Sequence, residues 1–363
     1  MRTVISAFAL TAFLLVANLG LAAAPPATAE PSPASVSPMI VLDAHQDCLH
    51  RILDRDDNLG ETYGDEQGNI PEWKEGGVNA IWFSVWVNPA KYPGRLAVNR
   101  AVALIRAFNH QCALYPKYLQ PCSTAEQVRR ATASGKIAAL LGIEGGAAIN
   151  NDLDLLPYYR QQGVRYMTLT WRGNLAWAGS SQAHESRAPN REMGLTDFGR
   201  QVVHEMNRLG IIVDLSHVSD QTFYDAIAIS NKPVIVSHSN CRALAPHPRN
   251  VTDDMLRRLA ANGGVIGVNF SRDFLKTAEQ KQDGGTPDIK TVADEVDHMV
   301  KIAGIDHVGM GTDFDGGITP ASGLKNAAAT PKLWVALRMR GYSDEDIRKI
   351  AGENFLRVLK ANE

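Results

Sequence analysis

The chain alternates between short apolar runs and longer stretches with helical periodicity. The apolar runs are MIVLDAH (39–45), AIWFSVWV (80–87), KIAALLGIE (136–144), VRYMTLTW (164–171), IIVDLSH (211–217), PVIVSH (233–238), GVIGVNF (264–270) and HVGMGTDF (307–314). Their short length and almost unbroken apolar character are typical of strands that are buried on both faces. The pattern therefore predicts eight strands of a parallel sheet.

The stretches between these runs carry helix signals. TDFGRQVVHEMNRLG begins at a capping Thr196, ends at Gly210 and places its apolar residues on one stripe. SDQTFYDAIAIS, TDDMLRRLAANGG and TVADEVDHMVKIAG, the last beginning at Thr291, show the same cap, stripe and terminator. Eight strand–helix units, with a final helical pair near the C-terminus, predict an α/β fold: a single-domain (β/α)₈ TIM barrel over residues 39–363. An open doubly wound sheet is disfavoured, because DAHQDCLH after the first strand lacks a glycine-rich dinucleotide turn.

The first 38 residues differ from the rest. One positive charge precedes a long apolar run, and small residues follow in GLAAAPPATAE. This order predicts a signal peptide over residues 1–24, with Ala29 as a second cleavage point, and a disordered leader over residues 25–38. An uncleaved membrane anchor is the alternative, since residues 4–24 nearly span a bilayer. Small residues and prolines favour cleavage, which predicts a secreted or periplasmic protein without a stable membrane anchor.

Composition narrows the class of partner. The 363 residues are 45% hydrophobic and carry a formal net charge of −2, with no block rich in lysine and arginine. This balance argues against nucleic acid or an anionic membrane surface as a partner. We expect a small-molecule substrate, and a homodimer is left open.

Export would permit a disulfide bond. Cys112 and Cys122 lie ten residues apart around an expected helix-to-helix loop, so they are the favoured pair if a bridge forms. Cys48 and Cys241 are better explained as small buried residues.

Ionisable side chains gather where the predicted strands end. They are His45 and Asp47 after the first strand, Glu144 after the third, His217 after the fifth, His238 after the sixth and Asp313 after the eighth. Barrel enzymes build their active sites at the C-terminal ends of the strands. Any one of these residues could belong to a core or a loop, but three histidines and three carboxylates at one rim favour a shared site.

This set of side chains predicts a pair of metal ions. Imidazole and carboxylate without thiolate suit zinc, with manganese, iron and cobalt as alternatives. The set divides into His45 and Asp47 for one ion, His217 and His238 for a second, and Glu144 as a bridge. Two such ions could share a hydroxide and polarise a carbonyl, and Asp313 is then the candidate proton shuttle.

Six motifs in order carry a family resemblance from about Met39 to the C-terminus. They are DAHQD, IEGG, GLTDFGRQVVHEMNRLGIIVDLSHVS, PVIVSHSNCRAL, HPRNVTDDML and HVGMGTDFDG. The chain resembles the membrane (renal) dipeptidase family, binuclear zinc peptidases of the amidohydrolase superfamily on a (β/α)₈ barrel. The resemblance implies two Zn²⁺ per chain on the five ligands given above, with Asp313 as the catalytic aspartate. It also implies that Arg249, in HPRN, binds the substrate's C-terminal carboxylate, which suits a planar guanidinium.

One position departs from the family pattern. The family's histidine after TLT, which helps to bind the substrate carbonyl, is replaced here by Trp171. An indole can donate one hydrogen bond but cannot ligate zinc, and losing such a donor costs on the order of 10²–10³ in rate. Arg172, Asn174 and His184 are the candidates to replace it.

The sequence therefore predicts a zinc-dependent dipeptidase that hydrolyses a peptide bond through a metal-bridging hydroxide. Trp171 keeps open a metal-dependent hydrolase of another amide, either a lactam or an N-acyl amino acid. An inactive barrel that acts as a binding protein is disfavoured, because none of the six rim residues is missing.

Overall fold

The computed structural model describes residues 39–182 and 193–363. The predicted signal peptide, the leader and His184 lie outside these residues. The strands are β1 (Leu42–Gln46), β2 (Ala80–Trp86), β3 (Leu119–Pro121), β4 (Ile137–Glu144), β5 (Val164–Thr168), β6 (Ile212–Asp214), β7 (Ile235–Ser239), β8 (Val265–Val268) and β9 (Val308–Met310). The helices are α1 (Cys48–Arg55), α2 (Ile70–Glu75), α3 (Arg95–Leu114), α4 (Ala125–Ala133), α5 (Leu155–Gln161), α6 (Asp197–Leu209), α7 (Asp220–Ile229), α8 (Asp253–Ala261), α9 (Arg272–Leu275), α10 (Ala278–Asp283), α11 (Ile289–Ala303), α12 (Pro331–Met339), α13 (Asp344–Arg348) and α14 (Asn354–Ala361).

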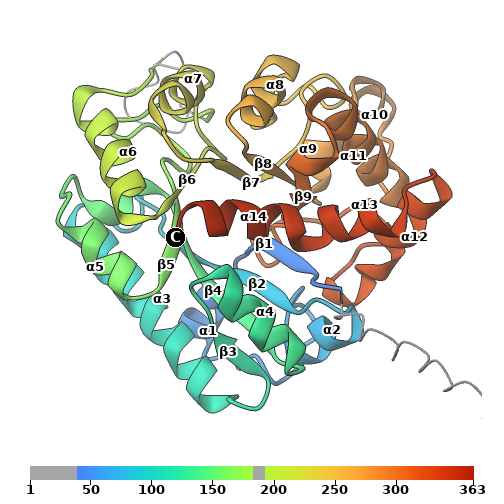
Figure 1. Cartoon of the computed structure of the whole chain (residues 1–363), viewed down its shortest axis with the longest axis horizontal. Coiled ribbons are helices and arrows are strands. Elements are labelled where there is room, and N and C mark those ends of the chain that lie inside the picture. Colours follow the sequence, from blue (N-terminus) through green and yellow to red (C-terminus); the bar gives the residue numbers. More distant parts are fainter. Residues whose placement is uncertain (1–38, 183–192) are drawn as a thin grey trace, which may run out of the picture. The chain divides into compact units, whose positions relative to one another are not determined.

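Eight of the strands close into a barrel. Each strand pairs in parallel with the next around the ring, β2 pairs directly with β4, and β9 returns to β1. Helices surround the strands, and the predicted single-domain (β/α)₈ barrel is confirmed (Figure 1). Each of the eight predicted runs overlaps one barrel strand, and β1 and β7 each extend one residue beyond their runs.

The ninth strand was not predicted. β3 pairs with residues 137–139 of β4, while β5 pairs with residues 141–144 of the same strand. The prediction that a loop alone joins helices α3 and α4 is therefore wrong, because β3 lies between them. Three residues ending in a proline give no apolar run that could have signalled a strand.

Strand alternation decides which side chains enter the barrel. In β4, Ala138 and Leu140 belong to the inner cluster, whereas Leu141 and Ile143 pack against the helices. Glu144 has the parity of Ala138 and Leu140, so it points into the barrel at the C-terminal end of the strand. The same inner cluster includes residues of α14, which crosses the centre of the barrel in Figure 1. The interior is therefore filled on the α14 side, and the opposite rim carries the polar residues.

The helix boundaries follow their caps. The Thr196 side chain accepts a hydrogen bond from the backbone N–H of Gly199, and α6 stops at Gly210, whose φ is 69°. Ser219 and Thr252 cap α7 and α8 as predicted. The predicted start of α11 is wrong, because the side chain of Asp288 accepts from the N–H of Thr291 and begins the helix earlier. Within the described ranges, no helix combines the length and hydropathy needed to cross a bilayer.

The cysteines are all free and buried. The favoured bridge between Cys112 and Cys122 is not formed in the structure. Cys122 directly follows β3, and its thiol donates to the carbonyl oxygen of Gln120 at 3.3 Å. Burial raises the pKa of both thiols to about 12, which makes them poor nucleophiles at neutral pH.

Candidate metal centre

Two histidines point into the barrel because their strands are irregular. The pairing register slips by one residue within 43–46 of β1 and within 236–239 of β7. A bulge of this kind bends the strand and re-aims the side chains beside it. The rings of His45 and His238 stack on each other, with centroids 3.8 Å apart. Sequence reasoning placed both residues at the rim but could not foresee the bulges.

The first ligand group contains His45, Asp47 and Glu144. Nε2 of His45 lies 3.2 Å from Oδ2 of Asp47 and 3.5 Å from Oε2 of Glu144. His45 lies within β1, which ends at Gln46, whereas Asp47 is the residue before α1. Asp47 is held there by its backbone N–H, which donates to the carbonyl oxygen of Phe314 at 2.8 Å. The turn into the helix thus brings the two side chains together.

The second ligand group shares the same glutamate. Oε1 of Glu144 lies 2.8 Å from Nε2 of His217 and 3.6 Å from Nε2 of His238. The two Nε2 atoms are 3.1 Å apart. Each carboxylate oxygen of Glu144 therefore faces a different pair of candidate ligands, which is the arrangement that a bridging carboxylate would need.

Unpartnered polar atoms indicate that these residues fit a cation. Nε2 of His45, Oδ1 of Asp47 and Nδ1 of His217 are buried without a hydrogen-bond partner in the described chain. Buried polar atoms are nearly always paired, so such a group needs an explanation. His217 also has a φ of 66°, a costly conformation for a residue with a side chain. A metal ion bound among these atoms would give the unpaired atoms of His45 and Asp47 a partner.

Asp313 lies within the cluster rather than beside it. Three sets have ligand atoms within 4.8 Å of one another: His45 with Asp47 and Glu144, Glu144 with His217 and His238, and His45 with His238 and Asp313. The Oδ2 atom of Asp313 accepts a hydrogen bond from the side-chain amide of Asn269 at 3.0 Å. All six rim residues predicted from the sequence are thus brought together.

Electrostatics favour positive charge in this cluster. Burial alone would lower the pKa of His45, but Tyr166, Asp47 and Glu144 together raise it well above its usual value. Burial would raise the pKa of Glu144, but the neighbouring histidines, His45 foremost, hold it well below its usual range. An ionised glutamate is the form that binds a metal, and a bound cation would supply the positive charge that these surroundings favour.

In the other members of the cluster, the pKa shifts favour the neutral form of the side chain. Burial lowers the pKa of His217 to about 3, with the charge of Arg249 as the next contribution. It likewise lowers the pKa of His238 well below its usual value. Burial raises the pKa of Asp313 to about 7. Neutral imidazoles suit metal binding, and a carboxyl that titrates near neutrality suits proton transfer.

Hydrogen bonds behind the cluster fix the histidine rings. The hydroxyl of Tyr166 lies 2.8 Å from Nδ1 of His45. The hydroxyl of Ser237 lies 2.7 Å from Nδ1 of His238 and donates to Asp214. Such contacts orient a ligating nitrogen toward the ion.

Replacing Tyr166 by phenylalanine should weaken metal binding by about 10–100-fold, because the ring of His45 loses the group that orients it. Competition with a chelator measures the affinity. Tyr159→Phe is the matched control, since its hydroxyl donates to Ala148 at 2.7 Å in a buried place outside the cluster. Equal affinities in the two variants would contradict this role of Tyr166.

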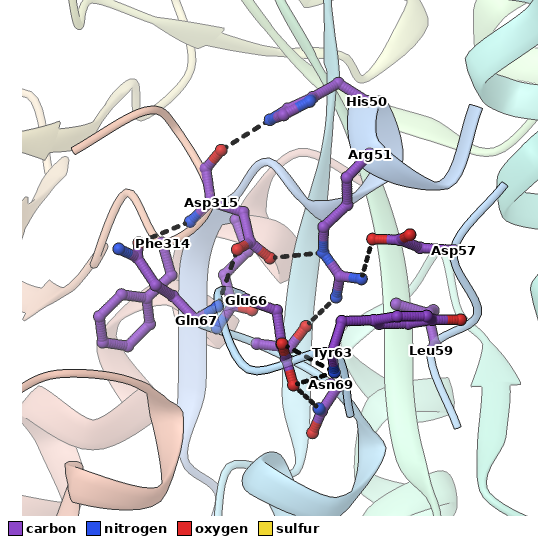
Figure 2. A network of polar contacts seen from close by, with 12 residues as sticks. His50, Arg51, Asp57, Leu59, Tyr63, Glu66, Gln67, Asn69, Phe314 and Asp315 are labelled. Atoms are coloured by element: carbon purple, nitrogen blue, oxygen red, sulfur yellow. Dashed lines mark hydrogen bonds and ion pairs between the residues drawn. The ribbon is translucent and has the colours of Figure 1, made fainter. Parts of the chain in front are cut away.

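A polar network supports the loop after β9 (Figure 2). The side chain of Arg51 donates to Oδ2 of Asp315 at 3.2 Å and to Asp57 at 3.3 Å. Gln67 and Asp315 exchange two further hydrogen bonds of 2.8 and 2.9 Å. Asp313 and Asp315 have φ values of 65° and 63°, so this network stabilises a strained turn. Sequence reasoning missed Arg51, because it stands in α1 with His50, Asp54 and Arg55 and nothing in the sequence distinguishes it from them.

Gly316 completes the same turn. A Cβ atom on it would lie 2.3 Å from Oδ1 of Asp313 and 2.8 Å from Oδ2 of Asp47. The two carboxylates can approach only because this residue has no side chain.

Arg249 lies directly beside the cluster. Its side chain is buried, with Nη1 donating to the hydroxyl of Ser239 at 2.5 Å and Nη2 to the carbonyl oxygen of His238 at 2.9 Å. Its Nε has no hydrogen-bond partner within the described residues, and burial lowers the pKa of the guanidinium to about 10. The guanidinium lies 5.6 Å from the ring centroid of Phe274.

A cavity of about 220 Å³ opens onto the cluster. Its lining includes Asp47, Glu144, His217 and Asp313 from the cluster, and also His50, Trp86, Trp171, Arg172, Ser271, Asp273, Phe274, Gly316, Gly317 and Ile318. Trp171 packs edge-on against Trp86, with ring centroids 5.1 Å apart. Of its predicted replacements, Arg172 lines the cavity, while Oδ1 of Asn174 accepts from the backbone N–H of Ser180 at 2.8 Å. Sequence reasoning missed Trp86, because its apolar strand made it look like a core residue.

The chain is similar to several proteins of known structure. A metallopeptidase from Rhodobacter sphaeroides, solved with a phosphinate mimic of the dipeptide L-Ala-D-Ala, is 29% identical, covers 90% of this chain and 99% of its own, and superposes with a TM-score of 0.79. Dipeptidase AC, a metallopeptidase of family M19, is 30% identical with coverages of 90% and 99% and a TM-score of 0.78. An amidohydrolase from Pseudomonas aeruginosa is 26% identical with coverages of 89% and 96% and a TM-score of 0.74. The family model for membrane dipeptidase, peptidase family M19, matches residues 34–363. Since that match takes in the whole barrel and its polar rim, the chain belongs to the membrane dipeptidase family and is a metallodipeptidase.

Proposed function

We propose that this protein hydrolyses dipeptides with two zinc ions held by His45, Asp47, Glu144, His217 and His238. The observation that supports this most is the division of the two Glu144 oxygens between two groups of ligands. Once bound, a pair of ions would supply a hydroxide at neutral pH and polarise the peptide carbonyl. Imidazole and carboxylate ligands without thiolate favour zinc.

Asp313 is the proposed proton carrier. It lines the cavity beside the cluster, where its carboxylate could accept a proton from the attacking water and pass it on. In peptide hydrolysis the proton from the attacking water must reach the leaving amine. Asn269 fixes Oδ2 by its hydrogen bond, which leaves Oδ1 to make that transfer.

Arg249 is the proposed partner of the substrate's free carboxylate. Its Nε has no hydrogen-bond partner among the described residues, and its positive charge interacts with the carboxyl groups of Asp313 and Glu144. A relative's binding of a phosphinate mimic of L-Ala-D-Ala supports small dipeptides as the substrate class. A clamp on the carboxylate would limit cleavage to substrates with one residue after the scissile bond.

Arg249→Ala should raise KM for free dipeptides at least tenfold with a smaller loss of kcat, because it removes a charge-assisted contact to a part of the substrate that does not react. Steady-state kinetics on free dipeptides and on the corresponding dipeptide amides measure this. An equal loss on both kinds of substrate would contradict the clamp.

The function is tested by comparing chelated and zinc-restored protein on a substrate panel. The panel contains L,L- and L,D-dipeptides, N-acyl amino acids and a lactam. Zinc-dependent cleavage of dipeptides is the expected result. Zinc-dependent cleavage of only the other amides would favour the second candidate, which Trp171 in the cavity wall keeps open. Inactivity of the zinc-loaded protein on the whole panel would contradict both.

Export from the cytoplasm is also proposed, supported by the charged, apolar and small-residue order at the N-terminus. N-terminal sequencing of the mature protein tests it, and a chain that still begins at Met1 would contradict cleavage.

A further inference from the structure

One wall of the cavity is a row of rings in edge-to-face contact that ends in an arginine. The edge of His50 meets Trp86 at a centroid distance of 5.8 Å, and Trp86 meets Trp171 at 5.1 Å. The guanidinium of Arg172 lies over the ring of Trp171, 5.1 Å from its centroid. All four side chains line the cavity.

Contact with Trp171 orients Arg172 and leaves its donors without a partner among the described residues. No ion pair or hydrogen bond engages this guanidinium in residues 39–182 and 193–363. Stacking uses the flat face of the group, so the N–H donors along its edge remain available. A planar edge of this kind matches a carboxylate, which it can bind through two parallel hydrogen bonds.

Arg172 lies near Arg249, the residue that we propose binds the carboxylate end of a substrate. The ring of Trp171, on which Arg172 lies, is 6.4 Å from the ring of His217, and His217 is 5.1 Å from His238. The carbonyl oxygen of His238 accepts a hydrogen bond from Arg249, so both arginines lie on this side of the cluster. The acidic groups that line the cavity are Asp47 before α1, Glu144 at the end of β4, Asp273 in α9 and Asp313 after β9. An anionic side chain would be repelled by those groups and attracted by Arg172.

We propose that Arg172 binds the side-chain carboxylate of the C-terminal residue, so that the preferred substrates are dipeptides that end in aspartate or glutamate. This inference rests on the proposed function. Arg249 then takes the main-chain carboxylate and Arg172 the side-chain carboxylate of the same residue. The rings of Trp171 and Trp86 would cover one side of this contact, while the other side stays open to solvent.

Matched substrates test the proposal. The kcat/KM of zinc-loaded protein is measured on Ala-Glu and Ala-Gln, on Glu-Ala and Gln-Ala, and on Ala-Ala. The wild type should prefer Ala-Glu to Ala-Gln by about tenfold, mostly through KM, as expected of one charge-assisted contact that stays partly solvated. The reversed pair should show no preference for the acid.

Two variants and a control assign the preference to Arg172. Arg172→Gln should bring the ratio of Ala-Glu to Ala-Gln close to one, and Arg172→Lys should keep part of it because the charge remains. Arg258→Gln is the matched control, since Arg258 is also exposed and lies 5.1 Å from the ring centroid of Tyr224 but does not line the cavity. It should keep the full ratio.

The outcomes separate this inference from the proposed function. A wild-type ratio near one, a ratio that survives Arg172→Gln, or a preference for acid at the N-terminal residue would overturn the specificity while cleavage of Ala-Ala still supports a dipeptidase. Failure to cleave any of the five dipeptides would contradict both.

Discussion

Asp313→Asn should lower kcat by on the order of 10²–10⁴ while both metal ions stay bound, because the variant keeps the shape of the side chain but cannot carry a proton. Asparagine is suited to this position. Asp313 has a φ of 65°, in the left-handed region that asparagine tolerates better than most residues. The amide oxygen can still accept the hydrogen bond that Asn269 donates.

The measurement is kcat on a good dipeptide together with metal content per chain. Asp56→Asn is the control, since Asp56 is exposed, has a φ of 60° and lies at the C-terminal end of α1, away from the cavity lining. It should keep the wild-type rate. A rate within tenfold of wild type in Asp313→Asn would refute the proton carrier. Loss of metal would instead make Asp313 a ligand, in line with its grouping with His45 and His238.

Glu144→Gln should remove most of the bound metal and lower kcat/KM by at least about 10³. An amide of the same size presents one oxygen in place of two and carries no negative charge, so it cannot serve both groups of ligands. In the native protein one oxygen faces His217 at 2.8 Å and the other faces His45 at 3.5 Å. The loss should affect both ions, whereas a change at His45 or His217 alone should mainly affect one.

Glu295→Gln is the matched control for this buried glutamate. Burial raises the pKa of Glu295 to about 7, so a neutral amide is tolerated there, and the residue lies outside the metal cluster. Its variant should bind metal as the wild type does. Full metal content in Glu144→Gln would contradict the bridging role.

The barrel could be predicted because parallel buried strands leave a strong pattern. Strands that are apolar on both faces, separated by capped helices, repeat eight times along the sequence. β3 could not be predicted, since a three-residue strand with Pro121 carries no such pattern. The predicted start of α11 lies too far along the chain. Asp288 and Thr291 are both good capping residues, and the local sequence does not show which of them caps the helix.

The membership of the polar rim was predictable, whereas its geometry was not. Parallel strands in a barrel bring their C-terminal ends to one rim, so His45, Glu144 and His238 had to approach one another. The bulges that turn the two histidines inward depend on the register of neighbouring strands and leave no local signal. The contact of Arg51 with Asp315 joins residues 264 positions apart, which a single sequence cannot reveal.

Anomalous diffraction at the zinc edge, from crystals of protein purified with zinc, tests the metal centre most directly. We expect two peaks about 3.5–4 Å apart, with Glu144 between them. One should be bound by His45 and Asp47, the other by His217 and His238, at about 2.0–2.2 Å. A single peak, or none among these five side chains, would contradict a two-metal site and with it the proposed mechanism.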